Sequence, residues 1–266
     1  MRTSLRSFAV LAALAGLAVL CAGAQSGSFI VAQHGNAVGT AEFNFTTTPN
    51  GYSSTSTVSI AMQGLNYALS KTESLSAANH MRHVQVSATV NNSAVNVTAS
   101  PDAAQFLLNV SASGKSTTAR LALHPAAVFL SDFDPGALET LLALAVAHNN
   151  RDLWAIIPKQ ATGPDGSVQA GSVSPVVLAT YADEQGTLDG KPIVAHHLVA
   201  TIAGGKTDLF SGPENQLLQA ELPQQGFALV RKGFVLTPPT RPIAPPDQPQ
   251  ALPTAQQSPA SQPLQQ

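Results

Sequence analysis

Residues 84–114, VQVSATVNNSAVNVTASPDAAQFLLNVSASG, decide the fold class because apolar and polar side chains alternate along them. Apolar residues occupy every second position of 84–90, and the same alternation returns at 106–111. Successive side chains of a strand point to opposite faces, so each segment buries one face and wets the other. Asn91-Asn92 and Ser113-Gly114 follow these runs and tolerate the positive φ of hairpin turns. The pattern predicts antiparallel strands, since parallel strands are usually apolar on both faces.

The same alternation recurs at 58–62 and 218–222, which extends the β prediction over most of the chain. Further turn signals separate β-like runs at Gly35-Asn36, Asn50-Gly51, Asp189-Gly190 and Gly204-Gly205. We count about a dozen strands and find no internal repeat of the kind that builds propellers or solenoids. The sequence predicts one all-β domain over 25–236, mainly antiparallel, with its sheet curved into a half-barrel or open barrel.

One segment departs from this pattern and predicts a helix near 135–149. Asp134 is suited to cap it and Pro135 to occupy its first position. Leucines and alanines lie at helical spacing but also elsewhere around the helix, so it is apolar on nearly all sides. Such a helix is buried or lies over an apolar groove. We therefore expect either a core helix packed in the curved sheet or a lid over a ligand cavity.

The first 24 residues have the features of a secretory signal peptide: Arg2 and Arg6, an apolar run over 8–21, and Ala22-Gly23-Ala24 before Gln25. We expect cleavage before Gln25 and a periplasmic or secreted protein. Cleavage would leave 11 basic and 15 acidic groups, a formal charge of −4. Nucleic-acid binding needs a basic surface, so that charge argues against such a partner. No second long apolar stretch follows, which predicts no integral membrane span in the mature chain.

The only cysteine, Cys21, lies inside the predicted signal peptide. Ala18 and Leu20 do not match the residues that normally precede an acylated cysteine, so we expect no lipid anchor there. The mature protein then has no disulfide and depends on its hydrophobic core. Residues 237–266 contain nine prolines and seven glutamines, which predicts a disordered tail.

No sequence motif predicts a catalytic site, a metal or a cofactor. Residues 114–117, GKST, lack the earlier glycine of a phosphate-binding loop and lie between two predicted strands, which indicates a hairpin turn. His196 and His197 are neighbours in a predicted strand and point to opposite faces, and His80 and His83 lack an acidic partner for zinc. We expect surface histidines.

Paired carboxylates are the remaining candidates for acid–base chemistry. Asp132 with Asp134, or Asp183 with Glu184, would have to face one pocket in different surroundings, which sequence spacing does not show. Asp134 already has the expected capping role.

The end of the domain carries a resemblance to a known architecture. It runs through 181–186 (YADEQG), 189–191 (DGK), 194–198 (VAHHL), 208–210 (DLF) and 216–223 (QLLQAELP) to 227–231 (FALVR). This layout of meandering strands resembles uncharacterised bacterial envelope domains and the curved half-barrel of the LolA and LolB lipoprotein carriers. The resemblance is architectural, covers about 27–234, and transfers no binding residue. It implies a sheet wrapped around an apolar cavity that a helix can cover.

These expectations lead to three hypotheses for function. The first is an exported, non-catalytic envelope protein that binds an apolar ligand, such as a lipid or a lipidated protein. The candidate lining residues are Phe106, Leu108, Leu138, Leu141, Leu142 and Val146. The second is a structural or adaptor protein of the envelope that uses its Pro/Gln-rich tail. The third is a hydrolase with a dispersed site, which requires a polar cluster such as His196 with Asp208 or Asp183.

Overall fold

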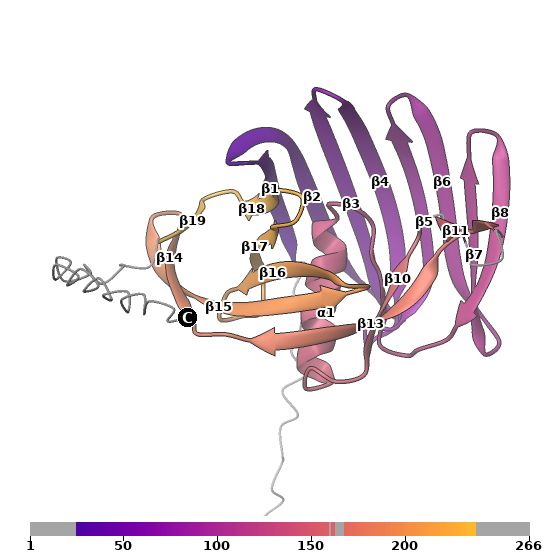
Figure 1. Cartoon of the computed structure of the whole chain (residues 1–266). Helices are drawn as coiled ribbons and strands as arrows, with labels where there is room; N and C mark the ends of the chain where they lie inside the picture. The colour runs from indigo at the N-terminus through magenta and orange to yellow at the C-terminus, as the bar shows by residue number, and fades with distance from the viewer. Residues whose placement is uncertain (1–24, 160, 163–167, 238–266) are drawn as a thin grey trace, which may run out of the picture.

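The computed structural model describes residues 25–237, apart from 160 and 163–167 (Figure 1). The predicted signal peptide and residues 238–266 of the predicted tail lie outside the described residues. The described part is built from strands and one α-helix.

The first eight strands form a meander in which each strand pairs antiparallel with the next. They are β1 (Ser26–Gln33), β2 (Asn36–Thr48), β3 (Gly51–Met62), β4 (Leu65–Leu75), β5 (Met81–Val90), β6 (Ser93–Asp102), β7 (Gln105–Ala112) and β8 (Lys115–Ala122). Residues 84–114, which predicted the fold class, form most of β5 and all of β6 and β7. Val90 of β5 lies opposite Ser93 of β6 across the turn at Asn91-Asn92. GKST lies in the β7–β8 hairpin, as predicted.

The second half of the chain joins the same sheet through the pairing of β18 with β1 and extends its curve. Its elements are β9 (Ala127–Phe129), α1 (Pro135–Ala147), β10 (Leu153–Ile157), β11 (Ala161–Thr162), β12 (Val168–Gln169), β13 (Ser172–Thr180), β14 (Glu184–Leu188), β15 (Lys191–Ile202), β16 (Gly205–Ser211), β17 (Leu217–Leu222), β18 (Phe227–Arg231) and β19 (Phe234–Leu236). From β1 the ladder continues through β18, β17, β16, β15, β13, β10 and β9.

The sheet is mainly antiparallel, curved and open, which confirms the predicted fold class. Only β9 and β10 pair in parallel among the described strands, and no described ladder joins β8 to β9. The described residues form nineteen strands, more than the dozen expected from sequence. The surplus includes β9, β11, β12 and β19, each of two or three residues, which is too short to show an alternating pattern.

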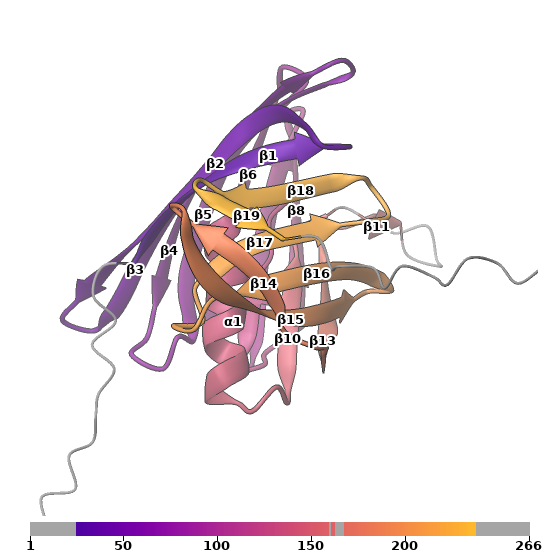
Figure 2. The same ribbon diagram turned by 90° about the vertical axis from the view of Figure 1, so that its left-hand side faces the viewer.

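Helix α1 lies between the long strands and the shorter second-half strands (Figures 1 and 2). It contacts β2 and β3 of the first half of the chain and β9 and β17 of the second half. Asp134 caps it, accepting hydrogen bonds from the backbone N–H groups of Gly136 at 3.0 Å and Ala137 at 3.2 Å. The helix ends at Ala147, two residues before the expected end. It is a core helix, as one of the two predicted alternatives required.

A second, smaller core lies on the other face of the second-half strands. Leu209 and Leu217 face the main core, whereas their neighbours Phe210 and Leu218 face the small one. Strand β14 pairs with β15 and β19 and covers this outer face. Both faces of the second-half strands are therefore packed against other side chains. These strands form a wall next to α1.

Candidate functional site

A hollow of about 300 Å³ opens where the loop before α1 meets the second-half strands. Its walls come from the loop 130–134, the first turns of α1, the end of β10, the β15–β16 turn and the β17–β18 turn. These segments are distant in sequence, and the pairing of β15 with β16 and of β17 with β18 brings them together. The site is therefore a product of the curvature of the sheet.

The floor of the hollow is apolar. It is formed by Leu130, Leu138, Ile157, Ile202, Leu222 and Leu229. Leu138 and Leu229 are almost fully buried, while the other four are half-buried and remain accessible. An apolar floor with a few polar groups at its rim is the common build of a small-molecule site.

Of the six lining residues predicted from sequence, Leu138 lines this hollow. Phe106 and Leu108 on β7, and Leu141 and Leu142 on α1, are at most 2% exposed and belong to the main core.

Val146 lies elsewhere, on the last turn of α1, and is 55% exposed. The helix was expected to be apolar all round, but its final turn extends beyond the sheets that bury the rest. The first turn of the helix, rather than its middle or end, is the part that faces the hollow.

Four charged residues line the hollow, and three of them have ionic partners. Asp132 pairs with Lys159 at 2.9 Å, and both side chains are at least half exposed. Asp134 pairs with Lys71 at 2.6 Å, with both side chains fully buried. Lys206 is exposed and has no ion-pair partner within the described part of the chain. The two aspartates thus lie in different surroundings in one hollow, and each is already neutralised by a lysine.

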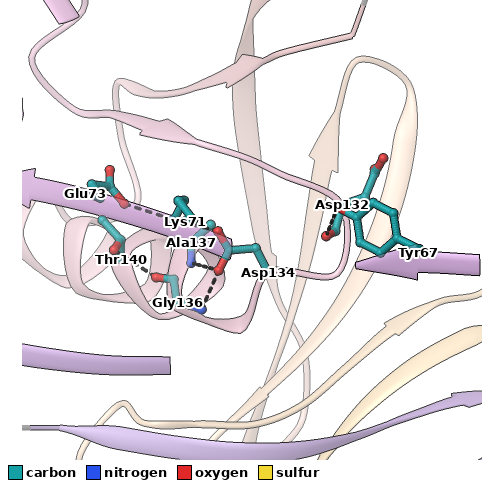
Figure 3. Close-up of polar contacts among 8 residues, drawn as sticks. All are labelled: Tyr67, Lys71, Glu73, Asp132, Asp134, Gly136, Ala137 and Thr140. Carbon is teal, nitrogen blue, oxygen red and sulfur yellow. Dashed lines mark hydrogen bonds and ion pairs between the residues drawn. The ribbon is translucent and has the colours of Figure 1, made fainter. Parts of the chain in front are cut away.

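Behind the hollow lies a buried ionic cluster that the sequence interpretation missed (Figure 3). Lys71 Nζ lies 2.9 Å from Glu73 Oε2 and 2.6 Å from Asp134 Oδ2, and all three side chains have no exposure to solvent. The cross-strand partners of Lys71 and Glu73 on β3 are Ser56 and Ser54, which are also buried. The cluster forms a polar band through the core that ties β4 to the start of α1.

Burial sets the charge state of this cluster. Burial alone would lower the pKa of Lys71, but Asp134 and Glu73 hold that pKa above its ordinary value, so the lysine is charged. Burial raises the pKa of Glu73, Lys71 opposes that rise, and Asp134 adds to it. Burial and the second carboxyl group thus favour the neutral form of Glu73, whereas the adjacent Lys71 favours its charged form.

Tyr67 fixes the loop that forms the near wall of the hollow (Figure 3). Its hydroxyl donates a hydrogen bond to the backbone carbonyl of Asp132 at 3.3 Å, and its ring packs edge-on against Phe133. Burial, with the nearby Asp132 and Asp134, raises the pKa of Tyr67 well above its usual range. The hydroxyl therefore stays a neutral donor.

A second buried carboxylate joins α1 to the strands beside it. Glu139 accepts a hydrogen bond from the backbone N–H of Leu217 at 2.8 Å and another from the side-chain amide of Gln25. Arg231 lies close enough to lower the pKa of Glu139, but burial outweighs it and raises that pKa to about 7. Arg231 donates to the Leu217 carbonyl at 2.7 Å and lies 5.2 Å from the ring centre of Phe29. These contacts hold the helix against β17.

Of the pairs named in the hydrolase hypothesis, His196 with Asp183 is formed, whereas Asp208 contacts His197 instead of His196. His196 Nδ1 lies 3.0 Å from Asp183, and His197 Nε2 lies 2.9 Å from Asp208, so each ring has its own partner. His197 also stacks on Phe210, and its side chain is 16% exposed, which makes it less superficial than predicted. Neither ring hydrogen-bonds a serine or threonine in the described residues.

The described residues contain no group of three histidine, cysteine or acidic side chains placed to hold a metal ion. Within the same part of the chain, the helix is too short to cross a membrane. The chain matches no protein-family model, no curated protein and no solved structure. The resemblance to lipoprotein carriers stays a prediction.

Proposed function

We propose that this is an exported, non-catalytic envelope protein that binds an apolar ligand, such as a lipid or a lipidated group, in the hollow beside the first turn of α1. The observation that carries the proposal is the half-buried aliphatic floor of that hollow. Half-buried aliphatic side chains that line a concavity gain about 25 cal/mol per Å² when a ligand covers them.

The supports around the hollow favour binding over catalysis. Lys71 and Tyr67 fix the loop 130–134 from behind, and the Lys71–Asp134 pair fixes the start of α1. A rigid, preformed site lowers the entropy cost of binding. Both aspartates at the hollow are engaged by lysines, which leaves neither as a free base for hydrolysis.

The export part of the proposal comes from the predicted signal peptide alone. The first described strand begins at Ser26, next to the expected cleavage site before Gln25. The backbone carbonyl of Gln25 accepts a hydrogen bond from the backbone N–H of Phe45 at 2.8 Å, so the residue expected to follow the cleavage site is held against β2.

The binding proposal is tested by filling the hollow. Thr207 on β16 is half-buried and lines it, so Thr207→Trp should place an indole in the space that the ligand needs. Thr89→Trp, at an exposed position of β5 away from the hollow, is the matched control. We expect the wild type and Thr89→Trp to enhance the fluorescence of the neutral apolar probe N-phenyl-1-naphthylamine, and Thr207→Trp to weaken probe binding at least about tenfold.

Equal probe binding by all three proteins would overturn the proposal, as would no binding by the folded wild type. The second outcome would favour the adaptor hypothesis, because a filled concavity leaves the surface and the tail as the functional parts.

A further inference from the structure

The hollow has an uncompensated positive charge at its rim. Asp132 is paired with Lys159 and Asp134 with Lys71, whereas Lys206 follows the β15–β16 turn without an ion-pair partner in the described residues. Gln224 and Gln225 also line the hollow, and the Gln224 side-chain oxygen would lie 3.6 Å from a Cβ added at Gly205, the residue before that lysine. The hollow is therefore lined by one unpaired cation, Lys206, together with the Asp132–Lys159 ion pair and neutral hydrogen-bonding groups.

The size of the hollow limits the apolar part of the ligand. A volume of about 300 Å³ lies at the lower end of the range for small-molecule sites. It has room for part of one alkyl chain and not for the two chains of a phospholipid. Each methylene covered adds about 0.8 kcal/mol, so one chain of moderate length is enough for measurable binding.

The charge at the rim indicates the head group. Phosphate recognition typically uses arginine forks or several cations, and no arginine lines the hollow. A single lysine with neighbouring amides matches a single negative charge, which is that of a carboxylate. The floor and the rim together describe an amphiphile with one chain and one carboxylate.

We infer that the hollow takes a fatty acid, with its alkyl chain on Leu138, Ile202 and Leu222 and its carboxylate at Lys206. This inference rests on the proposed function and narrows its ligand class. Lys206 is then a specificity residue: it selects an anionic head group, while the floor supplies most of the affinity. Salt should weaken the selection, since the lysine is exposed and screened.

Competition of laurate and dodecanol against bound N-phenyl-1-naphthylamine, at pH 8 on the full exported chain, tests the inference. Both compounds carry a twelve-carbon chain, so their difference isolates the head group. We expect laurate to compete about tenfold better than dodecanol with the wild type, and Lys206→Gln to reduce this preference to about twofold or less. Lys191→Gln, at the exposed first position of β15, removes the same charge away from the hollow and should keep the preference.

The outcomes separate the two proposals. If dodecanol competes as well as laurate, or if Lys206→Gln and Lys191→Gln behave alike, the head-group inference is wrong and apolar binding still stands. If the probe does not bind the wild type at all, both proposals fail.

Discussion

Removing the buried lysine is the sharpest perturbation of this fold, and Lys71→Met is the variant that does it with little change in side-chain volume. Lys71 lies 2.9 Å from Glu73 and 2.6 Å from Asp134, and none of the three side chains is exposed to solvent. Methionine would leave two carboxyl groups in the core without a cation. Breaking a buried ion pair from one side typically costs about 3–5 kcal/mol.

That cost is large against the total stability of a domain, which is about 5–15 kcal/mol. For a chain of this size it corresponds to a fall in Tm of about 6–20 °C. Equilibrium unfolding in urea measures the change directly. Lys115→Met, at the exposed start of β8, removes a surface lysine and should change the free energy of unfolding by no more than about 0.5 kcal/mol.

The loss should also depend on pH. Lys71 lowers the pKa of Glu73, so its removal lets burial raise that pKa further. A carboxyl whose pKa is higher in the folded than in the unfolded state stabilises the fold below the unfolded pKa, and this stabilisation disappears as pH rises through the folded pKa. The destabilisation by Lys71→Met should therefore be smaller near pH 5 than near pH 8. A variant within about 1 kcal/mol of the wild type at pH 8 would refute the buried cluster.

Two further variants test how α1 is held. Burial raises the pKa of Glu139 to about 7 from an ordinary 4.5, so the wild type should lose about 3 kcal/mol of stability as pH rises from 4.5 through 7. Glu139→Gln should flatten this dependence of the free energy of unfolding on pH, measured by urea unfolding at a series of pH values. Equal pH dependence in the two proteins would contradict the prediction. Gly136→Ala should destabilise by about 1–3 kcal/mol although alanine usually favours helices, because its Cβ would lie 2.5 Å from Ser56 Oγ and 3.2 Å from Phe43 Cβ. Ser56→Ala should recover part of that loss in the double variant, and no recovery would place the crowding elsewhere.

Hairpin turns were the most predictable local features of the sequence. Asn91-Asn92, Ser113-Gly114 and Asp189-Gly190 are turns in which both residues have positive φ, the conformation for which these residue types are suited. Elsewhere the turn lies one residue earlier than predicted, at His34-Gly35 and Ala203-Gly204. A non-glycine residue accepts the left-handed conformation there because strand pairing fixes the register on both sides.

The sequence contains a recognisable pattern for the buried ionic cluster. Along β4, the inward positions are apolar at Tyr67, Leu69 and Leu75, but Lys71 and Glu73 interrupt them with the same period of two. Two opposite charges on the buried face of a strand indicate a partner in the core. Asp134 was identified as a helix cap, yet its second role as the partner of Lys71 depends on where the helix packs, which local pattern does not specify.

The hollow was the least predictable feature. The sequence predicted a helix that could cover a cavity. The floor, however, is formed by residues at strand ends and turns, such as Ile157, Ile202 and Leu222, which are brought together by long-range strand pairing. Leu138 was identified because it lies in the helix. Lys206 belongs to no sequence motif. It becomes a candidate because the other charged residues that line the hollow form ion pairs.

Native mass spectrometry of the protein released from its own cell envelope tests the central claim most directly. We expect a population with the added mass of one small amphiphile, present in the wild type and Thr89→Trp and absent from Thr207→Trp, where the hollow is filled. A wild-type protein that carries no added mass, and that gains none when incubated with laurate, would contradict it.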